Sequence, residues 1–151
     1  MASKITDTVL KWSPLIGVMI TGMAGCKMKN SRKRQVLLAA GSVMVQSAMV
    51  ESLKKVVPER RPFPSLRKDS FPSGHTATSF AGAEMLRQET QEISPFISYS
   101  GYAIAIITGI MRIKERKHWL RDVLAGAAIG IASTQLTYRV NKKLFTGNAK
   151  S

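Results

Sequence analysis

The sequence is poor in the residues that bind metal ions or form disulfides. Its 151 residues include one cysteine, Cys26, and two histidines. A single cysteine excludes an intramolecular disulfide and a cysteine-based metal site. Because Cys26 lies in an apolar run, we expect it to be a small buried side chain. Acidic residues are scattered between Lys54 and Asp122 instead of clustering. We therefore expect no metal and no other cofactor.

Negative charge is also scarce, since 9 Asp and Glu residues stand against 23 Lys and Arg residues and give a net charge of +14. Such an excess favours anionic partners, namely nucleic acid, acidic lipid headgroups or phosphorylated substrates. The basic residues gather near segment ends, and aromatic residues make up only 7% of the chain. Nucleic-acid surfaces usually combine a basic stripe with stacking aromatics. We therefore expect no nucleic-acid partner.

The alternation of apolar and polar residues that marks β-strands is scarce. Five apolar or amphipathic stretches occur instead, at residues 12–26, 35–50, 70–83, 93–111 and 123–138, with Glu84 interrupting after the third. They predict an all-α bundle of about five main helices in one domain, residues 1–151. Only 93–111 clearly reaches the length of a bilayer-spanning helix. Hydropathy alone thus suits a soluble helical core nearly as well as a membrane bundle.

Three short clusters contain both histidines and several cations. They are Lys54 with Arg61-Pro62, then Pro72-Ser73-Gly74-His75, then Arg112 with His118 and Asp122. Phosphoryl transfer needs cations for the non-bridging oxygens, a nucleophile, and an acid for the leaving oxygen. The clusters offer all three, which predicts a metal-independent phosphohydrolase site.

The phosphate-binding part of this site is predicted from charge and helix geometry. Lys54, Arg61 and Arg112 are the candidate cations, and the two arginines can bind phosphate oxygens in bidentate fashion. Ser73 and Gly74 are expected to open a helix, where a hydroxyl and free backbone N–H groups favour an anion.

The catalytic part is predicted from the two histidines. Asp122 follows His118 by four residues, so on a helix its carboxylate can hold one imidazole nitrogen and leave a competent nucleophile. His75, beside the phosphate-binding loop, is placed to protonate the departing alkoxide.

The placement of the remaining charges suggests an orientation. The link 27–34 and the tail with Arg139, Lys142 and Lys143 are basic, and both fall on one side if the helices span a bilayer. The positive-inside rule assigns that side to the cytoplasm. We therefore expect an integral membrane protein, in a bacterial inner membrane, whose active site faces the periplasm or exterior. The face with the clusters is itself basic, which weakens this argument unless those charges bind phosphate.

The three clusters, in this order and with these spacings, resemble the signature of the type 2 phosphatidic acid phosphatase superfamily. That superfamily also includes bacterial class A acid phosphatases and vanadium haloperoxidases. The resemblance covers roughly residues 35–135. It implies a helical bundle with the active site at one end, and a phosphohistidine intermediate.

By motif position, the resemblance implies that His118 is the nucleophile, Asp122 its orienting partner, and His75 the acid and later the base. Lys54, Arg61, Ser73, Gly74 and Arg112 would bind phosphate. The chain departs from the family in having Met111, where a serine is usual, and in having five candidate helices where membrane members typically have six spans.

Three functions compete on this evidence. The first is an integral-membrane phosphatase that hydrolyses a lipid phosphate or pyrophosphate. The second is a soluble acid phosphatase of the same fold. The third is a non-catalytic anionic-lipid binder, against which the intact histidines and Asp122 argue, since binding alone needs no oriented nucleophile.

Overall fold

The computed structural model describes residues 8–9, 11–13, 15–18, 28–62 and 65–146, and its regular secondary structure is entirely helical over these residues. Four long helices are α2 (Arg32–Val56), α3 (Gly74–Thr90), α4 (Pro95–Lys114) and α5 (Leu120–Thr146). Helical turns between residues 8 and 18 precede them. The predicted all-α bundle is therefore confirmed. Cys26 lies outside the described residues.

The helix boundaries follow local sequence signals. Ser73 occupies the N-cap position of α3, which begins at Gly74 as predicted. Pro95 lies at the start of α4, where its missing N–H costs nothing. Glu84, which interrupts the apolar stretch in the sequence, lies within α3. The helix continues to Thr90 because the buried carboxylate of Glu84 accepts hydrogen bonds from the guanidinium of Arg87, at 2.9 and 2.6 Å.

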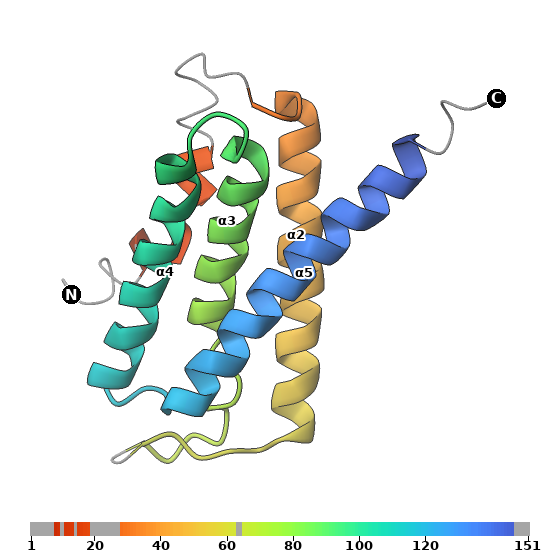
Figure 1. The fold of residues 1–151 in the computed structure, drawn as a ribbon. Coiled ribbons are helices and arrows are strands. Elements are labelled where there is room, and N and C mark those ends of the chain that lie inside the picture. The colour runs from red at the N-terminus through yellow and green to blue at the C-terminus, as the bar shows by residue number, and fades with distance from the viewer. Residues whose placement is uncertain (1–7, 10, 14, 19–27, 63–64, 147–151) are drawn as a thin grey trace.

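Helix α3 lies at the centre of the bundle and packs against α2, α4 and α5. Helix α5 crosses α2 and α3 diagonally (Figure 1). Glycines permit this close crossing: a Cβ atom at Gly126 would lie 2.5 Å from the carbonyl oxygen of Ser73, and one at Gly130 would lie 2.3 Å from that of Ala77. The spacing of Gly126 and Gly130 is that of small-residue contacts between membrane helices.

The distribution of side chains is inverted relative to a water-soluble bundle. Many buried residues are polar, including Ser42, Gln46, Ser79, Glu84, Glu89, Thr108 and Thr134. Many large apolar residues are exposed on the outer faces, including Leu37, Met44, Phe96, Ile106, Leu124 and Leu136. Two described helices, α2 and α4, are long and apolar enough to cross a bilayer, and most of each apolar segment is not buried inside the bundle.

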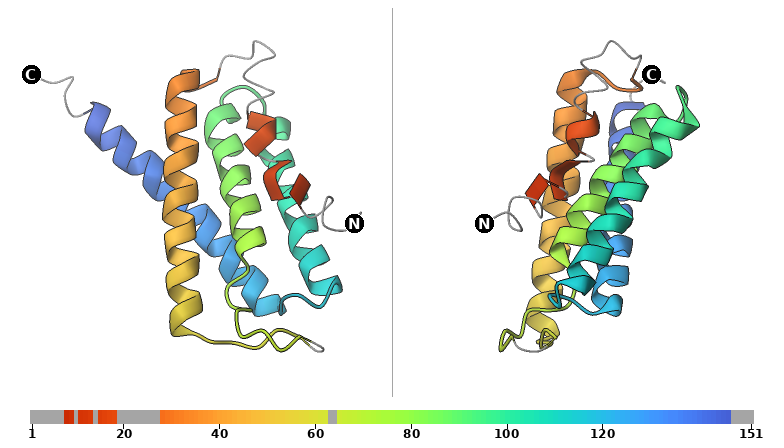
Figure 2. Two further views of the ribbon diagram at one scale, coloured as in Figure 1. Left: turned by 180° about the vertical axis from the view of Figure 1, so that it is seen from behind. Right: turned by 90° about the vertical axis from the view of Figure 1, so that its left-hand side faces the viewer.

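The connections gather at two ends of the bundle. The loop 57–73 and the turn between α4 and α5 lie at one end, and the start of α2 and the α3–α4 turn lie at the other (Figure 2). All three sequence clusters therefore meet at the first end, because Lys54 is in the last turn of α2 and Arg112 is in the last turn of α4.

Candidate active site

The loop 57–73 is tied to the turn before α5 and to the first turn of that helix. The backbone N–H of Ser73 donates to the carbonyl of Asp122 at 2.9 Å. The indole N–H of Trp119 donates to the carbonyl of Arg60 at 3.1 Å. Arg121 pairs with Glu59. These bonds fix the second and third sequence clusters against each other.

His118 is buried in this junction, with 3% of its surface exposed. Its Nδ1 lies 2.8 Å from the carbonyl oxygen of Ser70. A carbonyl can only accept, so Nδ1 carries the hydrogen and Nε2 of the neutral ring keeps its lone pair. Burial lowers the pKa of His118 to about 4, against the raising effect of the Ser70 bond, and the charges of Arg61 and Arg112 lower it further. The imidazole is thus neutral and able to act as a nucleophile at neutral pH.

Asp122 lies beneath His118 and is fully buried. Its Oδ2 accepts a hydrogen bond from the Ser70 hydroxyl at 2.5 Å and another from the Trp119 backbone N–H at 2.9 Å. The same oxygen is 3.7 Å from Nδ1 of His118. The structure therefore brings the predicted pair together, but the direct partner of the ring nitrogen is the Ser70 main chain, which Asp122 holds through the Ser70 side chain.

Two of the predicted cations, Arg61 and Arg112, lie near His118, and each of the three has an acidic partner. Arg61 makes two bonds to Asp69, at 2.9 and 3.1 Å. The buried Arg112 reaches Glu115 at 3.3 Å. Both guanidinium groups are close enough for their charges to lower the pKa of His118. Lys54 lies at the end of α2 and pairs with Glu51 at 3.5 Å.

Ser73, Gly74 and His75 form the start of α3. Ser73 is fully buried, and its hydroxyl shares a hydrogen bond of 2.9 Å with that of Thr76. Gly74 and His75 are partly exposed in the first turn. The start of a helix is a favourable place for an anion, because backbone N–H groups and the positive end of the helix dipole point toward it. The position of this helix start next to His118 follows from the bond between Ser73 and Asp122.

Sequence reasoning missed three residues of this region. Ser70 holds the His118 ring, and Asp69 holds Arg61. Burial would raise the pKa of Asp69, but hydrogen bonds and the charges of Arg61 and Arg67 lower it. Burial lowers the pKa of Lys11, as do the nearby charges of Lys54 and Arg112, so this lysine lies near both cations. No spacing rule in the sequence points to any of the three, because each contact depends on how the loop or the N-terminal segment folds back.

Comparison with known proteins agrees with the site. Residues 35–146 match the model of the PAP2 superfamily. The chain belongs to the PAP2 superfamily. This confirms the resemblance carried by the three sequence clusters.

Two curated PAP2 relatives have names that state a lipid phosphatase activity. The chain is 35% identical over 140 residues to a lipid A 1-phosphatase of Porphyromonas gingivalis, covering 92% of this chain and 31% of that protein. It is 29% identical over 160 residues to a probable diacylglycerol pyrophosphate phosphatase of Schizosaccharomyces pombe, covering 88% of this chain and 55% of that protein. The chain thus spans between about a third and about half of these relatives.

Solved PAP2-type structures share the fold. The crystal structure of Aquifex aeolicus LpxE superposes with a TM-score of 0.70 and 25% identity, covering 89% of this chain and 84% of that one. A transmembrane PAP2-type phosphatidylglycerolphosphate phosphatase from Bacillus subtilis superposes with a TM-score of 0.50 and 18% identity, covering 94% of this chain and 87% of that one. The helical bundle is therefore a fold that this chain shares with both solved structures.

Proposed function

We propose that this protein, as a single PAP2 domain over residues 1–151, is a metal-independent phosphatase that hydrolyses a lipid phosphate or pyrophosphate through a phosphohistidine intermediate. The observation that carries the proposal is the state of His118: buried, neutral, with Nδ1–H donated to the Ser70 carbonyl, Nε2 left with its lone pair, and the charges of Arg61 and Arg112 near enough to lower its pKa. The lipid phosphatase names of the relatives support the substrate class.

The proposed reaction has two steps. Nε2 of His118 attacks phosphorus, the bond from phosphorus to the lipid oxygen breaks, and protonated His75 gives its proton to the leaving oxygen. Water then attacks the phosphohistidine, gives a proton to His75, and the bond between phosphorus and nitrogen breaks. Phosphate leaves and both histidines return to their starting states.

Phosphate would be held by the cations and by the start of α3. Arg61 and Arg112 neutralise the charge that builds on the non-bridging oxygens, together with Lys54. Ser73 and the N–H of Gly74 bind the same oxygens. Each cation would have to face the phosphate while keeping its acidic partner, and Asp69 fixes the plane of the Arg61 guanidinium for this purpose.

A membrane location is the second part of the proposal. The apolar exterior and polar interior support embedding in a bilayer over the soluble acid phosphatase alternative. The basic segments at the start of α2 and in α5 support an orientation in a bacterial inner membrane with the active site on the periplasmic or exterior side.

The experiment is phosphate release from detergent-purified protein, with chelator present, on a panel of lipid phosphates, lipid pyrophosphates and one soluble ester. Wild type is compared with His118→Ala, His75→Ala and Arg112→Gln. Lys114→Gln, an exposed charge two residues after Arg112, is the matched control. We expect His118→Ala to lose release by about 10³-fold or more, and Lys114→Gln to keep it.

The same panel separates the alternatives. Folded protein that binds anionic lipid but releases no phosphate from any substrate would support the non-catalytic binder. A monodisperse protein without detergent that prefers the soluble ester would support the acid phosphatase.

A further inference from the structure

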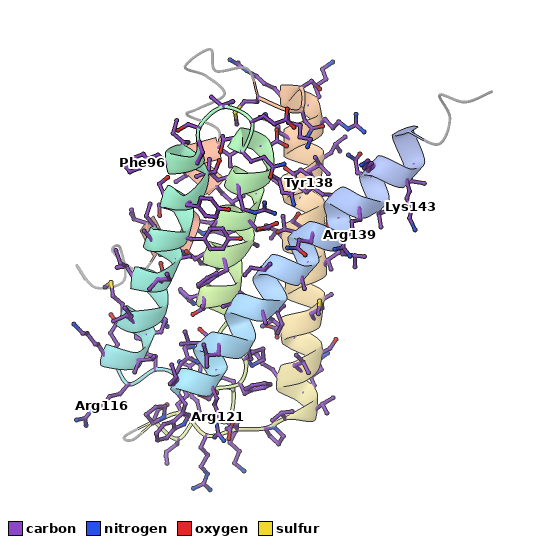
Figure 3. The ribbon with its side chains drawn as sticks, viewed as in Figure 1. Phe96, Arg116, Arg121, Tyr138, Arg139 and Lys143 are labelled. Atoms are coloured by element: carbon purple, nitrogen blue, oxygen red, sulfur yellow. The ribbon has the colours of Figure 1, made fainter. Side chains whose placement is uncertain are left out.

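A polar hollow lies far from the catalytic end of the bundle. It is a pocket of about 540 Å³ between the start of α2, the end of α3 and the C-terminal half of α5. Its lining includes Tyr138 and five cationic side chains, which are those of Lys29, Arg34, Arg87, Arg139 and Lys142. Figure 3 shows the separation along α5, with Arg121 at the catalytic end and Arg139 in the other half. Arg139 follows Arg121 by eighteen positions, which corresponds to about 27 Å of helix.

Two acidic residues near this end, Glu84 and Glu89, are buried and paired inside the bundle. Glu89 is buried and accepts hydrogen bonds from the Asn30 side chain at 2.7 Å, from the Asn30 backbone at 3.0 Å and from the Tyr138 hydroxyl at 2.6 Å. Glu84 is held by Arg87. These bonds make a rigid back wall, and no acidic side chain is among the residues that line the pocket.

The cations that line the pocket differ in their contacts. Arg34 donates to Asn141 at 3.3 Å, and Lys29 reaches the exposed Glu92 at 3.3 Å. Within the part of the chain that the structure describes, no acidic side chain pairs with Arg139 or Lys142. The pocket therefore carries a net positive charge, because Arg87 and Lys29 are paired with carboxylates but Arg139 and Lys142 are not among the ion pairs of the described residues.

A role in membrane orientation alone does not explain this arrangement. The positive-inside rule requires only that Lys and Arg lie on one side. It requires neither a hollow nor the convergence of cations from three helices on it. Basic pockets between helices near the cytoplasmic surface are suited to anionic lipid headgroups, and arginine fits phosphate in particular. The pocket volume lies in the range of ordinary ligand sites.

We propose that this pocket binds a phosphate group on the side of the membrane opposite the active site, supplied by the headgroup of an anionic phospholipid. The basis is the juxtaposition of Arg34, Arg139 and Lys142 over a wall fixed by Glu89 and Tyr138. Free inorganic phosphate has the same chemistry and is the other possible source. The inference rests on the proposed membrane location but not on the proposed phosphatase activity, since binding here requires no turnover.

The test measures lipid retention by the full chain in detergent with native mass spectrometry. The probes are phosphatidylglycerol, phosphatidylcholine with the same acyl chains, and inorganic phosphate. The pocket variant is Arg139→Gln/Lys142→Gln. The control variant, Lys33→Gln/Lys143→Gln, removes the same charge from exposed positions on the same end of the molecule that do not line the pocket.

Wild type and control should retain phosphatidylglycerol over phosphatidylcholine, and the pocket variant should lose about tenfold in affinity. Stabilisation of wild type and control by inorganic phosphate, without lipid retention, would assign the site to free phosphate instead. An equal loss of phosphatidylglycerol affinity in both double variants would overturn the proposal. So would a wild-type protein that binds neither phosphatidylglycerol nor inorganic phosphate. If the pocket variant does not fold, Lys142→Gln against Lys143→Gln gives the same comparison with one charge.

Discussion

At the residue scale, a main-chain carbonyl, that of Ser70, orients the candidate nucleophile His118. In a carboxylate–histidine pair the acid usually accepts from the ring N–H and sets its tautomer. Here the carbonyl of Ser70 takes that bond, and Asp122 accepts from the Ser70 hydroxyl. The carboxylate is therefore a positioning group that acts through Ser70, with an additional charge effect at 3.7 Å.

This arrangement predicts a graded effect of Asp122→Asn. When a carboxylate alone holds the ring, its amide variant costs about 10⁴-fold in kcat. Because Ser70 fixes the tautomer here, we expect a loss of about 10- to 10²-fold in kcat, with little change in KM, by phosphate release from the best lipid substrate. A loss as large as that of His118→Ala would show that Asp122, and not Ser70, sets the tautomer.

The pKa of His118 predicts the pH dependence of stability. Its folded value of about 4 lies below the ordinary 6.5, so the unfolded chain takes up this proton first as pH falls. The unfolding free energy contributed by His118 is therefore intact above pH 6.5 and decreases as pH falls from 6.5 to about 4. In thermal melts, His118→Gln should be less sensitive to pH than wild type in this window. If the melting temperatures of the two proteins change equally with pH between 6.5 and 4, the depressed pKa of His118 is contradicted.

The residue types of the site could be predicted from the sequence, and their contacts could not. The motif spacing predicts which side chains would meet phosphate, because each motif is short and local. Ser70, Asp69 and Lys11 contribute through a loop and an N-terminal segment that fold back on the bundle. No local pattern determines such contacts.

At the scale of elements, the crossing of α3 and α5 positions the site. Helix α5 brings Asp122 to the backbone of Ser73 only because Gly126 and Gly130 let its backbone approach α3. The sequence showed the small residues but not which of them face α3. It also showed that Glu84 interrupts an apolar run, but not that its carboxylate is buried and paired with Arg87 within α3.

We expect Gly130→Ala to separate the two helices. The new Cβ would lie 2.3 Å from the Ala77 carbonyl oxygen. This oxygen belongs to the backbone, so relieving the clash requires one of the two helices to shift. The cost should be about 1–3 kcal/mol, seen as a lower melting temperature in detergent. Gly17→Ala is the matched control, because its Cβ would meet only a Leu86 methyl at 4.0 Å. If the two variants have the same melting temperature, the close crossing of α3 and α5 is not needed for stability.

At the scale of the whole molecule, the inverted distribution of polarity favours a bilayer around the bundle. Hydropathy of single runs left a soluble core open, because several runs are short for a membrane span. The structure adds which faces are exposed, and these carry Leu37, Phe96 and Ile106 while Glu84 and Glu89 are inside. Apolar surface facing outward on several helices is costly in water and favourable in lipid.

The orientation predicts the labelling of engineered thiols in intact cells. In a Cys26→Ser background, Lys68→Cys in the exposed loop of the catalytic end should react with an impermeant maleimide. Lys143→Cys, at the other end, should react only after permeabilisation. The reverse pattern would place the active site in the cytoplasm, and reaction of both in intact cells would argue against a bilayer-spanning bundle.

The central claim is covalent catalysis by His118, and trapping the intermediate tests it most directly. Detergent-purified protein would be mixed with ³²P-labelled lipid phosphate in the presence of chelator, quenched in alkali and mapped. We predict an alkali-stable, acid-labile label on His118 in wild type and none in His118→Ala. Phosphate release by His118→Ala at the wild-type rate, or a label on another residue, would contradict the claim.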